Sequence, residues 1–249
     1  MMHIRRAGRA GRAGRVGRQG GFSLLELLIS VTIGVFLLAG IAGVLAVTRQ
    51  NFNAQAGMGQ LQDDQRIAVN MLVSVVEHAG YYHDVQKETA VTSFPLAAPF
   101  VDEGHSVVGS SGSGGSSPGA DSISVRYMQS PGGTASSDFL QDCNGISNTG
   151  NTAVLSVNTF TLDSQNQLTC AVGGNAAKPL AGGVSSFTVL YGVDRDKDRS
   201  VDFYLPAQAM PPSYWGLVGS VRVDLVFIHP LDRDKPITVK RVINLMGRA

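Results

Sequence analysis

The chain has 249 residues and a formal net charge of +1 at pH 7, but this charge is unevenly spread. Six arginines and no acidic residue lie in the first 21 residues, which leaves −5 (+1 − 6) for residues 22–249 and argues against a basic nucleic-acid-binding main domain. About 200 residues follow the first long apolar run, enough for one domain with its own core.

The apolar run covers residues 22–47, directly after the basic leader, and contains one charge, Glu26. A stretch of at least about 18 apolar residues predicts a membrane-spanning helix, and preceding arginines predict that the N-terminus stays cytoplasmic. A secretory signal peptide has a shorter apolar core and a nearby small-residue cleavage site, and neither is present. A nucleic-acid-binding tail is the alternative for the arginine repeat, but it lacks interleaved aromatic residues.

The helix is predicted to continue beyond the membrane, so that one long helix covers residues 22–80. In residues 48–79, apolar residues recur at a spacing of three or four and polar residues fall mostly on the other side, which is typical of an amphipathic helix. The apolar positions are Leu61, Ala68, Met71, Leu72, Val75, Val76 and Ala79. Gly80 is predicted to cap the C-terminal end.

Residues 81–249 are predicted to form a β-rich domain. Within it, the glycine- and serine-rich stretch 104–119 predicts a flexible loop. Short apolar–polar alternations follow, separated by turn residues: DSISVRYMQ, AVLSV, FTLD, NQLTCAV, SSFTVLYG, VDFYL, SVRVDLVFI and ITVKRVINL. They predict antiparallel strands, with the last two as a hairpin. We therefore expect an α+β fold in which the long helix lies against an antiparallel sheet.

The two cysteines, Cys143 and Cys170, lie beyond the predicted membrane span. An exported domain is in an oxidising compartment, so an even pair predicts one disulfide, worth about 3–4 kcal/mol in the loop-entropy model. Two buried thiols are the alternative that the spacing alone leaves open.

The segment GFSLLE, residues 21–26, followed by an apolar helix and a β-rich domain, resembles a type IV pilin-like prepilin. The resemblance implies that a membrane peptidase cleaves after Gly21, so that the leader 1–21 is lost, and then methylates the new N-terminal residue, Phe22. It also implies that Glu26 pairs with the N-terminal amine of a neighbouring subunit during assembly, which satisfies two charges that are costly in lipid. The alternative is a glutamate that only snorkels to the membrane interface.

Later segments narrow this resemblance. PLAGGVSSFTVLYGVDRDKDRSVDFYL, VRVDLVFI and VKRVINL are similar to the PilW group of minor pilins. The similarity implies a single-pass inner-membrane protein with a periplasmic C-terminal domain, which enters the pilus after assembly. Its implied role is to prime pilus assembly and lie at or near the tip. The implied partners are other minor and major pilins, the prepilin peptidase, the inner-membrane assembly machinery and a tip adhesin, with no direct nucleic-acid contact.

Two other functions are compatible with the same sequence. A minor pseudopilin of a type II secretion system would share the leader, Glu26 and the fold. A single-span periplasmic sensor or binding module would keep its leader uncleaved. The sequence contains no Walker loop, nucleophile elbow or HExxH motif, and its five histidines show no metal-ligand spacing, so we expect no enzymatic activity.

The acidic stretch DRDKDRSVD, residues 194–202, raises the question of a calcium site. Asp194, Asp196, Asp198 and Asp202 occupy the first, third, fifth and ninth places of an EF-hand-like loop, and Ser200 would offer its carbonyl at the seventh. However, Arg199 stands where that loop needs glycine, and Leu205 stands where a bidentate glutamate closes the site. The sequence therefore favours a charged hairpin turn without a cofactor and leaves calcium as the alternative.

Overall fold

The computed structural model describes residues 21–112, 120–132 and 140–246. The chain divides into two compact units, one ending at Phe52 and the other starting at Asn53. Helix α1 (Leu24–Val76) begins in the first unit and ends in the second. The fold is α+β, as predicted, because this apolar helix is followed by antiparallel sheets. Of the predicted leader, residues 1–21, only Gly21 lies within the described residues.

In the first unit, α1 is long and apolar enough to cross a membrane, and none of its apolar window is buried within the structure. Ser23 precedes the helix and caps it, since its hydroxyl accepts a hydrogen bond from the amide of Leu25 at 3.3 Å. Glu26 lies in the first helical turn. A carboxylate there is favoured by the positive end of the helix dipole.

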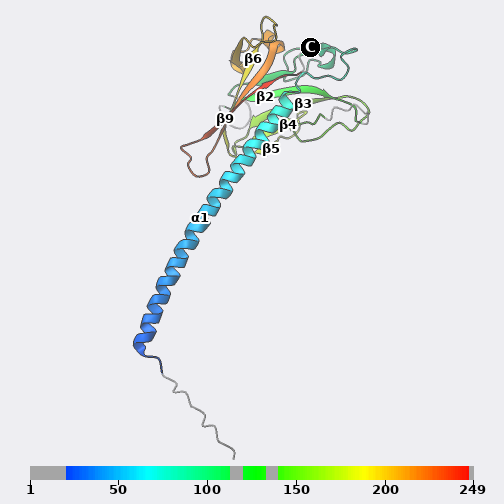
Figure 1. Cartoon of the computed structure of the whole chain (residues 1–249). Coiled ribbons are helices and arrows are strands. Elements are labelled where there is room, and N and C mark those ends of the chain that lie inside the picture. The colour runs from blue at the N-terminus through cyan, green and yellow to red at the C-terminus, as the bar shows by residue number, and fades with distance from the viewer. Residues whose placement is uncertain (1–20, 113–119, 133–139, 247–249) are drawn as a thin grey trace, which may run out of the picture. The chain divides into compact units, whose positions relative to one another are not determined.

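In the second unit, the later part of α1 buries the predicted apolar stripe, with Leu61, Ala68, Leu72, Val75 and Val76 inside. Figure 1 shows this part, in cyan, lying against the strands. The helix ends at Val76, earlier than the predicted end, and Gly80 takes a left-handed φ of 83° in the turn that follows. Its amide donates to the carbonyl of Arg126 at 2.9 Å, so the turn is joined to the sheet.

The first sheet has five antiparallel strands in the order β1-β2-β3-β4-β5. The strands are β1 (Val107–Ser110), β2 (Ser122–Gln129), β3 (Val154–Leu162), β4 (Leu168–Val172) and β5 (Lys178–Ala181). The short helix α2 (Ala90–Ser93) precedes them and carries a capping box at Thr89. Two predicted strands, AVLSV and FTLD, are parts of the single strand β3.

The second sheet has four antiparallel strands in the order β7-β6-β8-β9. These are β6 (Val184–Val193), β7 (Phe203–Pro206), β8 (Val218–Phe227) and β9 (Ile237–Asn244), with the 3-10 helices η1 (Ala207–Ala209) and η2 (Pro212–Leu217) between β7 and β8. The predicted β8–β9 hairpin is confirmed.

The presence of two sheets corrects the expectation of one. The chain leaves the first sheet at Ala181 and enters the second at Val184, and Gly183 between them takes a φ of 68°. Glycine reaches this conformation without steric cost, so the chain can turn sharply there. Both sheets and α1 share one hydrophobic core.

The prediction of one flexible loop over residues 104–119 is wrong for Val107–Ser110, which forms β1 and pairs with β2. The valines of this strand, Val107 and Val108, are buried. Gly109 is glycine for a packing reason: a Cβ there would lie 1.7 Å from the hydroxyl oxygen of buried Tyr191 and 2.6 Å from the carbonyl oxygen of Ser122. Residues 113–119 lie outside the described part of the chain.

Candidate assembly and processing site

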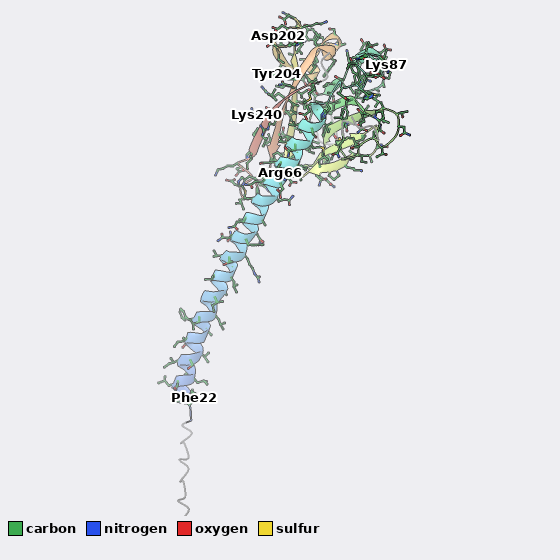
Figure 2. The ribbon with its side chains drawn as sticks, turned by 45° about the vertical axis from the view of Figure 1, so that its right-hand side comes forward. Phe22, Arg66, Lys87, Asp202, Tyr204 and Lys240 are labelled. Carbon is green, nitrogen blue, oxygen red and sulfur yellow. A yellow bond between two sulfur atoms is a disulfide. The ribbon has the colours of Figure 1, made fainter. Side chains whose placement is uncertain are left out.

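The predicted processing site lies just before α1. Gly21 and Phe22 precede the helix, both are exposed, and no atom lies within 4 Å of where a Cβ of Gly21 would be. Figure 2 shows Phe22 at the start of α1. Among the described residues the Gly21–Phe22 bond is therefore exposed, and glycine allows close approach to the backbone.

Glu26 is placed four residues after Phe22, in the first turn and exposed. Within residues 21–112, 120–132 and 140–246 it makes no ion pair. Ser23 and Glu26 also match the S-x-x-E pattern of a capping box, a local signal that the sequence analysis overlooked. The cap explains why the helix begins at Leu24, but it leaves the cost of a carboxylate in lipid unexplained.

The two cysteines form a disulfide, as the sequence predicts, with a sequence separation of 27. Buried polar groups hold the loop that contains Cys143. The side chain of Asn158 on β3 accepts a hydrogen bond from the amide of Cys143 at 2.9 Å, and the hydroxyl of Tyr127 donates to the carbonyl of Gln141. Burial raises the pKa of Tyr127 to about 12, so this hydroxyl remains a donor at neutral pH. The bridge thus joins a side-chain-anchored loop to β4.

The aspartate loop connects β6 to β7, as predicted, and Figure 2 shows Asp202 at its end. Three carboxylates, from Asp194, Asp196 and Asp202, offer oxygen atoms that all lie within 4.8 Å of one another. Asp198 is not in this group, and its side chain instead accepts the amide of Ser200 at 2.7 Å. The structure therefore brings together three of the four predicted carboxylate ligands.

Backbone amides donate hydrogen bonds to all three clustered carboxylates, and Asp196 accepts the amide of Asp198 at 3.3 Å. Asp202 accepts the amide of Arg195 at 2.7 Å, and Asp194 accepts the amide of Arg199 at 2.9 Å. Lys197 and Arg199 both have positive φ, 62° and 74°, which costs a side-chain-bearing residue about 1–2 kcal/mol. Calcium takes about 6–8 oxygen ligands, so three carboxylates fall short of a complete site. The loop is an acidic turn whose clustered carboxylates are hydrogen-bonded to its own backbone.

A further residue, Arg126 on β2, was missed by the sequence analysis. It is fully buried, and its guanidinium donates to main-chain carbonyls: Nε to His105 and Nη1 to Pro95, each at 2.6 Å, and Nη2 to Phe94 at 3.3 Å and Asp102 at 3.4 Å. Desolvation lowers its pKa to about 10, which still leaves it charged at neutral pH.

Two aromatic rings complete the surroundings of this arginine. Its guanidinium carbon lies 4.0 Å from the ring centroid of Phe100 and 5.5 Å from that of Phe94. Cation–π contacts of this kind are worth more when the cation is desolvated. All of these carbonyls and rings belong to the segment between α1 and β1, so Arg126 joins this segment to β2. We call Arg126 with these carbonyls and rings the Arg126 clamp.

Comparison with known families agrees with the sequence resemblance. The family model described as Type IV Pilus-assembly protein W matches residues 147–244, and the prokaryotic N-terminal methylation motif matches residues 17–42. Among curated proteins, none matches the chain. The first match covers β3 to β9, and the second covers the processing site, Glu26 and the start of α1. Together they indicate a structural rather than an enzymatic protein, and they fit a membrane-anchored pilin. By these two matches the N-terminal part of the chain is similar to type IV pilin-like prepilins, and its C-terminal strands are similar to the PilW family of pilus-assembly proteins.

Proposed function

We propose that this chain is a minor pilin that primes assembly of a type IV pilus and lies at or near its tip. The observation that carries the proposal is Glu26, an exposed carboxylate in the first turn of an apolar helix, four residues after an accessible Gly21–Phe22 bond. Among the described residues, no cationic side chain forms an ion pair with this carboxylate. A cation from another subunit would satisfy it.

The proposed sequence of events begins with cleavage after Gly21, which frees the amine of Phe22. Methylation keeps this amine basic, so it can pair with a carboxylate. Glu26 of one subunit then pairs with the amine of its neighbour, which turns two charges that are separately costly in lipid into one neutral pair. The inner-membrane anchor holds the β domain on the periplasmic side until the subunit enters the pilus.

N-terminal sequencing of membrane-extracted protein tests the processing step. We expect the mature chain to begin at methylated Phe22, and Gly21→Val to leave the leader attached. An intact N-terminus on the wild-type chain would reject the prepilin function and favour an uncleaved sensor or binding module.

The pairing role needs a second measurement, the amount of subunit in sheared pili. Glu26→Ala should be cleaved normally and yet enter pili much less well than the wild type. Asp63→Ala is a matched control, since Asp63 is an exposed carboxylate farther along the same helix. Equal incorporation of Glu26→Ala and Asp63→Ala would show that the pairing role is wrong. Normal pili but failed protein secretion in a deletion strain would favour a secretion pseudopilus.

For the aspartate loop, we propose a turn without a resident metal. The support is that backbone amides occupy the carboxylates of Asp194 and Asp202, while Lys197 and Arg199 supply positive charge nearby in the sequence. Calorimetric titration with calcium tests this proposal.

A further inference from the structure

The Arg126 clamp is a costly way to hold a loop. Burial of a guanidinium costs several kcal/mol in desolvation free energy. No ion pair with a carboxylate offsets this cost, since Arg126 forms none of the salt bridges among the described residues. The guanidinium contacts the main chain at Phe94, Pro95, Asp102 and His105, so these bonds do not depend on which side chains the segment 94–105 carries. Phe94 and Phe100 are buried beside the guanidinium, whereas other side chains of the segment are exposed.

Large apolar side chains stand on the outside of this held segment. Val91, Leu96 and Val101 are 54%, 61% and 49% exposed. Leu96 and Val101 are the chain neighbours of Pro95 and Asp102, whose carbonyls meet the same guanidinium. The main chain next to these two side chains therefore converges on one guanidinium.

Val91 belongs to the same surface. A Cβ on Gly104 would lie 3.5 Å from a methyl group of Val91, and the amide of Gly104 donates to the carbonyl of Phe94 at 2.9 Å. Val91 is therefore next to the stretch that contains Val101. We call Val91, Leu96 and Val101 the clamped patch. Figure 2 marks the preceding part of the segment by Lys87.

The border of the clamped patch is acidic. Asp102 and Glu103 follow Val101 directly, both are exposed, and neither takes part in a salt bridge with any described residue. Lys87, the lysine of the segment between α1 and β1, is already paired with Asp84 at 2.9 Å. An anionic membrane surface would repel such a border. A protein with basic side chains around an apolar centre would complement it.

We propose that the clamped patch is a docking surface for another pilin subunit, one that presents an apolar centre with a basic rim. The inference rests on the proposed function, because the assembly supplies the partner. Rigidity favours this role: a loop ordered in advance loses less conformational entropy on binding than a free one. The clamp thus places three apolar anchors before the partner arrives.

Site-specific photo-crosslinking in the bacterium that makes the pilus tests the proposal on the full-length chain. A photoreactive residue replaces Leu96, and the same residue replaces Leu231 as a control, because Leu231 is 59% exposed but lies in the loop between β8 and β9. We expect an adduct at Leu96 whose partner is a different protein with a processed, methylated N-terminus, and no such adduct at Leu231.

Charge reversal supplies the second arm. In the chain that carries the photoreactive residue at position 96, Glu103→Lys should reduce the yield of the adduct about tenfold, equivalent to about 1.4 kcal/mol of binding free energy. The matched control is Asp234→Lys, an exposed acidic residue in the loop between β8 and β9, which should leave the adduct unchanged. Equal effects of the two reversals would contradict the assigned basic rim.

Leader cleavage, seen as a size shift, separates failure of this proposal from failure of the proposed function. A cleaved subunit that gives no adduct at Leu96, or an adduct only with a second copy of itself, would overturn the docking surface and leave the prepilin function intact. A chain that is never cleaved would overturn both.

Discussion

The Arg126 clamp makes a sharp prediction about stability. In Arg126→Met, the apolar stem keeps most of the packing volume, but four carbonyl oxygens, those of Phe94, Pro95, Asp102 and His105, lose their donor. Hydrogen bonds to a charged group contribute about 1.5–3 kcal/mol each, and only the two bonds at 2.6 Å are short enough to count fully. Because methionine avoids the desolvation cost of the guanidinium, we expect a net loss of about 3 kcal/mol.

Equilibrium unfolding in urea measures this loss. The protein contains a single tryptophan, Trp215, which is buried and lies 4.7 Å from the ring of Tyr191, centroid to centroid, so its fluorescence reports on the β domain. The full chain is kept in a non-ionic detergent, which covers the apolar part of α1. With an m-value of about 2 kcal/mol/M, a loss of about 3 kcal/mol lowers the midpoint by about 1.5 M.

Two further variants complete the experiment. Arg126→Lys keeps the charge but not the planar fork, so it should be destabilised about as much as the methionine variant. Arg222→Met is the matched control: Arg222 lies on β8, is partly exposed, and pairs with Asp224 at 3.6 Å, so its loss should cost less than about 1 kcal/mol. If Arg126→Met and Arg222→Met unfold at the same urea concentration, the clamp does not contribute as argued.

Four other predictions follow from the same structure. Cys143→Ser should cost about 3.5 kcal/mol in urea unfolding without affecting leader cleavage, since it opens the loop closed by the disulfide. Gly109→Ala should cost about 3 kcal/mol through overpacking, whereas Gly59→Ala, in open space on α1, should stabilise by up to about 1 kcal/mol; equal effects would contradict the packing argument. Calorimetric titration with millimolar calcium should be flat, and heat of binding that disappears in Asp196→Ala would show a metal site instead. Burial lowers the pKa of His105, so the folded state favours the neutral imidazole. This contribution to stability is complete above pH about 6.5 and is lost as the pH falls through the lowered pKa. On acidification, the urea midpoint of His105→Gln should therefore decline less than that of the wild type.

The local features of this protein were readable in the sequence because each depends on neighbours in the chain. The apolar stripe of α1 was predicted from a spacing of three or four, since side chains at that spacing share one face of a helix. The alternating strands of the second sheet and the β8–β9 hairpin followed from their period of two and their turn residues. The processing motif and Glu26 are also contiguous, so the resemblance that they carry needed no tertiary information.

The features that the sequence concealed depend on contacts between distant segments. Arg126 occupies a polar position in the alternation of β2, which predicts an outward-facing side chain, but the segment 94–105 covers that face and buries it. Val107–Ser110 lies in a stretch with the composition of a linker, and only its pairing with β2 and the approach of Tyr191 to Gly109 show that it is a strand.

The aspartate loop combines a feature that the sequence determines with one that only the tertiary structure decides. The spacing of its carboxylates is a property of the sequence, and it raised the question of a metal. Which carboxylates converge is decided by backbone conformation: left-handed Lys197 and Arg199 leave Asp194, Asp196 and Asp202 together and Asp198 apart. Those conformations are held in the folded chain by hydrogen bonds such as that from the Arg199 amide to Asp194, the first residue after β6. Spacing along a chain fixes the order of the side chains, whereas the fold fixes their directions, and a binding site requires both.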